Sequence, residues 1–195
     1  MKAIIIGAGI GGLTTGIALE QAGLDVEIFE RELVLRAVGA GLTLWANAIY
    51  ALDQVGLGEP LRQHSIMSGE GGIHDNDAKN IMVTNTHTLQ QQLGVPSVVI
   101  HRADLQDLLL DRFNGTIHYA KQLTTYQQKD NQVCVQFGDG TQATGDILIG
   151  CDGIHSVVRQ QMYPESKPIY AGYTAFRGVL AFDHARVGKM WGESW

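Results

Sequence analysis

The chain has 195 residues, of which 45% are hydrophobic and 17% are charged, a composition typical of a globular protein with one good core rather than of a disordered chain. Its net charge of -6 and lack of any basic run argue against nucleic acid, because phosphate binding requires clustered Lys and Arg. Cys134 and Cys151 form no CxxC pair and are predicted to be buried reduced thiols, so we expect neither a disulfide nor a metal site.

The first residues already predict a strand, which leaves no room for the charged and apolar regions of a signal peptide. No apolar run approaches the ~18 residues that would suggest a membrane span. We therefore expect a soluble cytoplasmic protein.

The amino-terminal part of the chain predicts a strand, a helix and a second strand in succession. Residues 4–6 are a short apolar run, typical of a strand buried on both faces of a parallel sheet. A helix is predicted over 10–22, because apolar residues recur at helical spacing and Gly23 can end it. Residues 26–30 alternate and end on an acid, so they predict the second strand of a βαβ unit.

Further along the chain, helices and β-like stretches alternate. Helices are predicted over 47–55 and 102–113, strands over 116–120 and 147–149 (the latter buried), and a hairpin over 133–144 with its turn at 138–140. Residues 65–85 and 169–182 are β-like, with Gly71-Gly72 and Asp75-Asn76 as turns. The alternation of buried strands with helices predicts an α/β fold with a doubly wound core.

A glycine-rich turn separates the first strand from the first helix. Gly7-Ala8-Gly9-Ile10-Gly11-Gly12 has the spacing G-x-G-x-x-G, which is typical of a dinucleotide site in this position. Gly7 permits a tight turn, Gly9 leaves space for a pyrophosphate, and Gly12 lets the helix pack closely on the strand. The free N–H groups at the helix start, Gly11 among them, are expected to bind the phosphates.

Glu30 supplies the acid that such a site requires. It lies eighteen residues beyond Gly12, at the end of the second predicted strand, where it is expected to accept hydrogen bonds from a ribose diol. The alternative is a glycine-rich turn with an unrelated surface Glu. The turn does not separate FAD from NAD, but Glu30 disfavours NADP at this site, although Arg31 follows it.

A second glycine–acid motif occurs at Gly150-Cys151-Asp152-Gly153, with Ser156 opening a helix. Taken alone, it is explained equally well by Asp or Ser capping that helix. Taken with the glycine turn, it resembles the Asp-Gly motif of the FAD-dependent aromatic-ring hydroxylases. These group A flavoprotein monooxygenases include salicylate, 3-hydroxybenzoate and urate hydroxylases and zeaxanthin epoxidases.

The resemblance covers nearly the whole chain and implies its organisation. It implies a Rossmann-like, doubly wound FAD-binding domain made of residues 1–65 and 101–167. Residues 66–100 and 168–195 would form part of an inserted β-sheet substrate domain.

The same resemblance implies further cofactor contacts. Thr43 lies in the segment 36–48, which passes along the flavin in relatives. Arg102 matches an arginine that reaches the phosphate and ribityl region, Leu123 a position whose backbone contacts the adenine side, and Asp152 the acid beside the pyrophosphate. The alternative for Arg102 is a solvated residue at a helix start. A cation in that position interacts unfavourably with the helix dipole, so binding of an anionic group would explain why an arginine occurs there.

One motif of the family is missing from the chain. Relatives carry Gly-Asp followed shortly by His, well downstream of the Asp-Gly motif. Here the Gly-Asp pairs are Gly138-Asp139 and Gly145-Asp146, which precede that motif and are predicted as turns. The resemblance therefore implies an amino-terminal portion, whose partner is a separate C-terminal half or a second copy.

The activity implied by the resemblance is aromatic hydroxylation. NADH or NADPH reduces the flavin, which traps O2 as a C4a-hydroperoxide that hydroxylates a small aromatic substrate. The flavin carries this chemistry, so the catalytic residues stay unknown. Tyr173 and Arg177 are placed to face a substrate, but cross-strand packing explains them equally well. Two alternatives remain, an FAD-dependent reductase or dehydrogenase of the same fold and a non-catalytic FAD-binding remnant.

Overall fold

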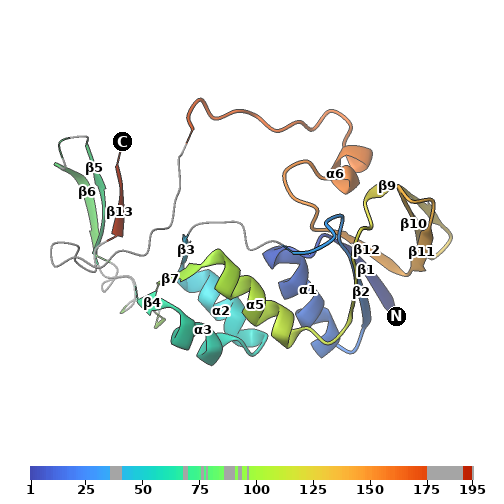
Figure 1. The fold of residues 1–195 in the computed structure, drawn as a ribbon, viewed down its shortest axis with the longest axis horizontal. Helices are drawn as coiled ribbons and strands as arrows, with labels where there is room; N and C mark the ends of the chain where they lie inside the picture. Colours follow the sequence, from blue (N-terminus) through green and yellow to red (C-terminus); the bar gives the residue numbers. More distant parts are fainter. Residues whose placement is uncertain are drawn as a thin grey trace. The chain divides into compact units, whose positions relative to one another are not determined.

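The computed structural model describes residues 1–35, 41–67, 70–75, 77, 79–85, 91, 94–95, 97–174 and 191–194 (Figure 1). The chain divides into two compact units. The first consists of residues 1–37 and 106–175, and the second of residues 38–105 and 176–195.

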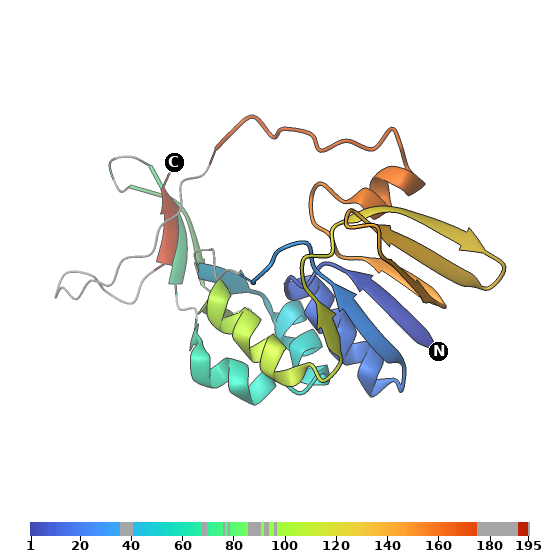
Figure 2. The same ribbon diagram turned by 45° about the vertical axis from the view of Figure 1, so that its right-hand side comes forward.

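A parallel sheet forms the centre of the first unit. Its strands are β1 (Lys2–Ile6), β2 (Asp25–Phe29), β8 (Thr116–His118) and β12 (Ile147–Gly150). They lie in the order β12-β1-β2-β8, and each neighbouring pair is parallel. Helix α1 (Ile10–Gln21) connects β1 to β2 and lies beside the sheet in both ribbon views (Figures 1 and 2). The predicted α/β fold and its opening βαβ unit are confirmed.

The first unit has a dense apolar core because β1 is covered on both faces. Ile4, Ile5 and Ile28 are fully buried. On one face, Gly16 of α1 lets the helix approach β2, since an added Cβ would lie 3.2 Å from Ile28 Cδ1 and 2.9 Å from the Phe113 ring. On the other face, one cluster joins the sheet to the strands that follow β8: Ile4, Ile6, Phe29, Leu123, Val133, Val135, Phe137 and Val158.

An antiparallel meander supplies that second covering layer. It comprises β9 (Leu123–Lys129), β10 (Gln132–Phe137) and β11 (Gln142–Gly145), in the order β11-β10-β9. The predicted hairpin is confirmed, with Gly140 at a φ of 83° in its turn. Strand β9 was not predicted from the sequence.

Asp139 lies in the same turn. Hydrogen bonds from Lys121 and Thr141 hold the pKa of the Asp139 carboxyl well below its usual range.

Aromatic and charged side chains tie β2 to its neighbours. The ring of Phe29 stacks on His118 at a centroid distance of 4.6 Å and on Phe137 at 4.7 Å. Glu27 pairs with Lys2 at 2.7 Å and with His118 at 3.1 Å. Burial alone would raise the pKa of Glu27, but these two partners outweigh it and lower the pKa.

The described residues of the second unit include small antiparallel and mixed sheets and the short helices α2 (Ala46–Gln54) and α3 (Gly58–His64). Strands β3 (Gly41–Leu44) and β4 (Ile66–Met67) both pair antiparallel with β7 (Val98–His101). Strand β5 (Glu70–His74) pairs antiparallel with β6 (Asn80–Asn85) and parallel with β13 (Trp191–Ser194).

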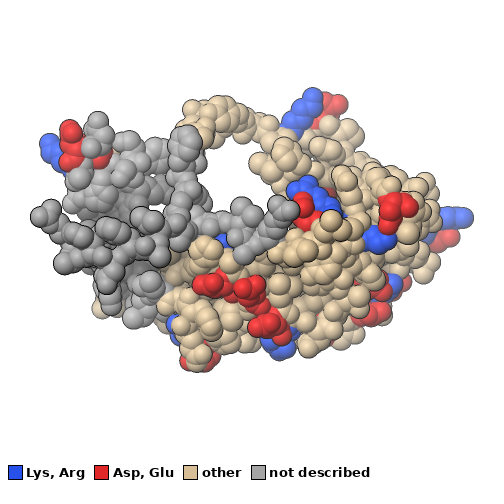
Figure 3. Space-filling view, in the orientation of Figure 1, with Lys and Arg blue, Asp and Glu red and all other residues tan. Residues whose placement is uncertain are grey.

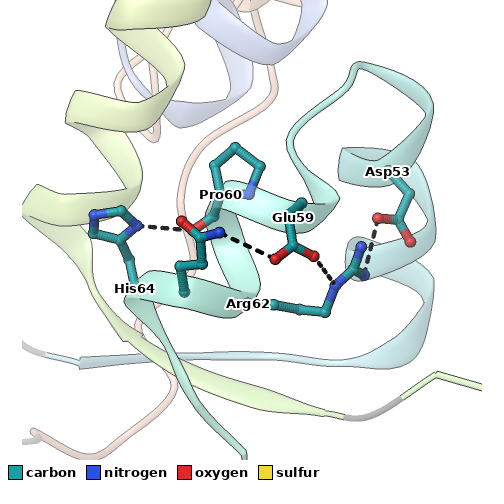
Figure 4. Close-up of polar contacts among 6 residues, drawn as sticks. Asp53, Glu59, Pro60, Arg62 and His64 are labelled. Atoms are coloured by element: carbon teal, nitrogen blue, oxygen red, sulfur yellow. Dashed lines mark hydrogen bonds and ion pairs between the residues drawn. The ribbon is translucent and has the colours of Figure 1, made fainter.

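The corner between α2 and α3 is held by an exposed polar network (Figure 4). The Arg62 guanidinium lies 3.3 Å from Asp53 Oδ1 and, through Nε, 3.3 Å from Glu59 Oε2. An added Cβ on Gly58 would overlap the Asp53 carboxylate, so a larger residue here would displace that side chain from the network. Exposed ion pairs of this kind contribute little individually to the free energy of folding. We therefore interpret the network as structural and not as a functional site. Helix α3 was not predicted.

Helix α5 (Arg102–Arg112) crosses the division between the units, and its predicted existence is confirmed. Leu105 and Leu109 are buried, whereas Asp104, Asp107 and Asp111 are exposed. Acidic side chains accordingly gather over this helix in the space-filling view (Figure 3). The exposed acids and the buried leucines therefore lie on different faces of α5.

Several sequence predictions need correction. Gly71-Gly72 was predicted as a turn but lies within β5. Strand β12 was predicted to be buried, yet it is the edge of its sheet, and Ile147 is 36% exposed. Residues 169–174 form no strand, and residues 175–182 of the same predicted stretch lie outside the described residues, as does Asn76. Within the described part of the chain, no helix is long and apolar enough to cross a membrane.

Candidate functional site

Three segments singled out in the sequence meet at one edge of the parallel sheet. The glycine turn follows β1, Glu30 follows β2 and Cys151-Asp152 follows β12, and these strands are neighbours in the sheet. The Gly7 amide donates to the Phe29 carbonyl at 2.8 Å, and the Cys151 amide donates to the Ile6 carbonyl at 2.8 Å. In a doubly wound fold, this carboxyl edge is where ligands bind.

Gly7 and Gly12 are required by the packing of the turn itself. Gly7 has a φ of 102°, and an added Cβ there would overlap the Cys151 carbonyl. A Cβ on Gly12 would overlap the Gly7 carbonyl, which lies against the first turn of α1. The glycine turn and the Asp-Gly segment are therefore in direct contact, and neither position tolerates a side chain.

Gly9 and Gly11 differ from this pair. Apart from the adjoining backbone, no atom of the described residues lies within 4 Å of a Cβ added to either one, so the packing of the chain does not require their small size. Gly9 is the N-cap of α1, with extended backbone, and no side chain among the described residues caps the helix. The first N–H groups of an α-helix have no intrahelical acceptor, so this end of α1 presents free donors beside open space.

Glu30 joins the turn to the second strand. Its side chain is 8% exposed, with Oε2 accepting from the Ala8 amide at 2.8 Å and Oε1 from the Glu32 amide at 3.0 Å. These two charge-assisted bonds offset the cost of burying a carboxylate. A carboxylate has about four acceptor sites, so Glu30 retains the capacity to accept from ribose hydroxyls.

The segment after β8, which leads to the predicted contact residue Leu123, runs beside Glu30 through hydrogen bonds that were not foreseen from the sequence. The Lys121 amide donates to the Glu30 carbonyl at 2.8 Å, and the Ala120 amide donates to the Glu32 carbonyl at 3.1 Å. Ala120 has a φ of 57°, in the left-handed region that non-glycine residues rarely adopt. Leu123 follows on β9, where its buried side chain belongs to the apolar core. Only its backbone is left for a ligand, and that contact stays a prediction.

Asp152 caps helix α6 (Val157–Met162). Its Oδ2 accepts from the Val157 amide at 2.6 Å and the Val158 amide at 3.3 Å, while Ser156 Oγ accepts from the Arg159 amide at 2.9 Å. Asp152 Oδ1 is buried and has no hydrogen-bond partner among the described residues. The capping interpretation is therefore supported by geometry, and the cofactor role of Asp152 stays a prediction.

The other sequence candidates are not among the residues that make these contacts. Thr43 on β3 and Arg102 at the start of α5 belong to the second unit, where Thr43 is half-buried and Arg102 is exposed. The exposed Arg31 side chain pairs with Glu32 at 3.4 Å. Tyr173 is exposed, and Arg177 lies outside the described residues. Contacts of these residues with a ligand stay predictions.

Cys151 packs beneath the turn and, like Cys134, is half-buried rather than buried as the sequence predicted. Burial raises the pKa of its thiol, which keeps it protonated and unreactive at neutral pH. Within the described ranges, no group of three or more His, Cys, Asp or Glu side chains is placed to hold a metal ion. Gln106 on α5, which sequence reasoning missed, donates to the Ala8 carbonyl at 3.3 Å.

Comparisons of the chain with known proteins agree on one family. Residues 1–178 match the family described as FAD binding domain. The chain is 32% identical to an aurachin C monooxygenase/isomerase of Stigmatella aurantiaca, covering 100% of this chain and 51% of that protein. It is 33% identical to a 3-hydroxybenzoate 6-hydroxylase of Klebsiella oxytoca, covering 92% of this chain and 47% of that protein.

A solved structure shows the same likeness in three dimensions. The Klebsiella pneumoniae protein HpxO, complexed with FAD and uric acid, matches with a TM-score of 0.73 and 30% identity, over 83% of this chain and 41% of that one. The FAD-dependent urate hydroxylase of Klebsiella pneumoniae is 32% identical over 98% of this chain and 51% of its own length. The chain thus spans about half the length of the curated relatives it matches.

Proposed function

The chain belongs to the FAD binding domain family, and from this premise we propose that it is the FAD-binding portion of a flavin-dependent monooxygenase. The complete enzyme would use NADH or NADPH and O2 to hydroxylate a small aromatic or similar heterocyclic substrate. One observation carries the proposal: the open, uncapped start of α1 and the buried Glu30 carboxylate meet at the carboxyl edge of the sheet.

The residues present at this edge fit FAD. The N–H groups at the start of α1 would bind the pyrophosphate, with Gly9 and Gly11 leaving it room to approach the backbone. Glu30 would accept from the adenosine ribose, and the backbone near Leu123 would lie on the adenine side. When bound, the flavin would carry electrons from the nicotinamide to O2. The chain itself binds, orients and shields the cofactor.

Hydroxylation is favoured over simple reduction because the relatives that match over nearly the whole chain are named monooxygenases and hydroxylases. An FAD-dependent reductase or dehydrogenase of the same fold would share the turn and Glu30. The complete protein separates the two: a hydroxylase consumes the nicotinamide cofactor in an oxygen-dependent reaction that a phenol or purine stimulates. Nicotinamide oxidation that is indifferent to O2 and to such compounds would favour the reductase.

Strand β12 marks where further protein would complete the unit. It is the edge of the parallel sheet, and an open cleft of about 450 Å³ lies beside it. The cleft is lined on its apolar side by Ile147, Leu148, Val158 and Met162. Exposed apolar surface beside an unpaired strand edge favours association. We propose that the other half of the enzyme, or a second copy of this chain, covers this edge.

The 195-residue chain alone is therefore expected to hold FAD weakly and to hydroxylate nothing, since a site open to water on one side does not protect reactive species. Adding a separately made C-terminal half should tighten FAD binding and restore substrate-stimulated oxygen uptake. A chain that purifies yellow, stays monomeric and hydroxylates at an ordinary rate would contradict this part of the proposal.

The proposed location is the cytoplasm. Cys134 and Cys151 are free thiols, as is usual for proteins of a reducing compartment. Fractionation of cells followed by immunodetection of the protein tests this assignment.

A further inference from the structure

Ala8 occupies the centre of the glycine turn and is fully buried, with 0% of its surface exposed. Both of its backbone polar groups are bonded to side chains from elsewhere in the chain. The Ala8 amide donates to Glu30 Oε2 at 2.8 Å, and Gln106 Nε2 donates to the Ala8 carbonyl at 3.3 Å. The Glu30 side chain, which follows β2, and the Gln106 side chain, which lies on α5, therefore hold successive peptide groups of the turn.

The two bonds control different peptide groups. Glu30 holds the peptide that joins Gly7 to Ala8, whereas Gln106 holds the peptide that joins Ala8 to Gly9. Because a trans peptide is planar, its N–H points opposite to its C=O. Fixing the Ala8 carbonyl toward Gln106 therefore also fixes the direction of the Gly9 amide.

The Ala8–Gly9 peptide needs such a constraint. Glycine adopts a wide range of backbone conformations, so a peptide next to Gly9 has little intrinsic resistance to rotation. Apart from its chain neighbours, no atom of the described residues lies within 4 Å of a Cβ on Gly9, so steric packing does not supply the constraint either. An apolar side chain at position 106 would in addition leave the buried Ala8 carbonyl without its donor.

We propose that Gln106 is a positioning residue, which orients the Gly9 amide and with it the phosphate-binding start of α1. The side chain itself need not touch the cofactor, since it acts through the Ala8 carbonyl. The consequence for ligand affinity rests on the proposed FAD site, whereas the ordering of the turn does not.

Three variants isolate the hydrogen bond. Gln106→Met keeps the length of the side chain and removes the donor, and Gln106→Lys keeps a donor. Asp107→Asn is the matched control, because Asp107 is the exposed neighbour on the same helix. Backbone hydrogen exchange is measured on the ligand-free chain for the hydrogen-bonded amides around the turn, those of Gly7, Ala8 and Leu13, with residues 157–162, the whole of α6, as an internal reference.

In Gln106→Met, exchange of the Gly7, Ala8 and Leu13 amides should rise about fivefold, the factor for losing one ordinary hydrogen bond, while residues 157–162 stay unchanged. Gln106→Lys and Asp107→Asn should resemble the natural chain. ADP affinity, measured by calorimetry, should fall about fivefold in Gln106→Met alone, as the same bond is lost.

Unchanged exchange of the Gly7, Ala8 and Leu13 amides in Gln106→Met, or an equal rise over residues 157–162, would overturn the positioning role. Faster exchange with undiminished ADP affinity would overturn its relevance to the ligand. Failure of the proposed function looks different: the natural chain would bind neither ADP nor FAD, while the exchange experiment would still decide the role of Gln106.

Discussion

Helices α1 and α6 both begin at the carboxyl edge of the parallel sheet, after the neighbouring strands β1 and β12, but their first turns are built differently. Ser156 and Asp152 satisfy the first amides of α6 with their own oxygens. At α1 the N-cap is Gly9, and no described side chain takes this place.

The difference shows how one fold position serves two purposes. Side chains that cap a helix fill the space at its start and accept hydrogen bonds from its first backbone N–H groups. An anion would need both that space and those N–H groups. A glycine at the N-cap leaves the space and the N–H groups available, but it does not order the turn. Hydrogen bonds of Ala8 with Glu30 and Gln106 order the turn instead. We therefore assign the phosphate-binding role to α1 and a structural role to the start of α6.

The largest expected effect lies within the glycine turn. Gly12→Ala should lower the free energy of unfolding by about 3 kcal/mol, because its Cβ would overlap the Gly7 carbonyl. Gly11→Ala is the matched control, since its Cβ meets no described atom and alanine favours a helix. Urea unfolding measures both, and equal losses in the two variants would remove the distinction between packed and open glycines.

Glu30→Gln tests the ligand side of the same turn. It should weaken FAD binding by about 1–3 kcal/mol, because a charged hydrogen-bond acceptor becomes a neutral amide. Flavin fluorescence quenching measures the affinity, and Glu32→Gln, an exposed neighbour, serves as control. Equal FAD affinity in Glu30→Gln and the natural chain would contradict the assignment.

Arg102→Ala asks whether a cation from α5 reaches the phosphates. Losing one charged hydrogen bond should weaken FAD binding by about 1.5 kcal/mol and leave riboflavin, which has no phosphate, nearly unaffected. Comparative titration with the two flavins distinguishes these effects. A uniform loss for both would indicate a structural role for Arg102.

Asp152→Ala tests the capped helix and has the smallest expected effect. Loss of the cap should lower the free energy of unfolding by about 1 kcal/mol, and Ser156→Ala should cost a similar amount. Thermal unfolding measures the change. If Asp152→Ala instead leaves stability intact and abolishes FAD binding, the comparison between α1 and α6 fails.

The sequence predicted those parts of the molecule that depend on local patterns. The turn before α1, the helix itself and the hairpin of β10 and β11 each follow from spacing and turn residues within a short stretch. Strand β9 was missed because its sequence, Leu123–Lys129, is mostly polar and exposed, and only pairing with β10 defines it. Helix α3 was missed because seven residues carry too little periodicity.

The contacts that order the site were beyond sequence reasoning for a related reason. Gln106 is distant from Ala8 in the chain, and its apolar neighbours on α5 indicate only a helix. Ala120 adopts a left-handed conformation that no residue type signals. Glu30 was recognised because its spacing from the glycines is part of the motif, although its bonds to the Ala8 and Glu32 amides were not foreseen.

The most direct test of the central claim follows the amide signals of the ¹⁵N-labelled chain by NMR during titration with ADP. We expect the largest shifts at Gly9, Ile10 and Gly11, with the amides of residues 157–159 unmoved. These α6 amides are the internal control, since they occupy the equivalent place after the neighbouring strand. Shifts concentrated at the start of α6, or none at the start of α1 when ADP binds, would contradict the account.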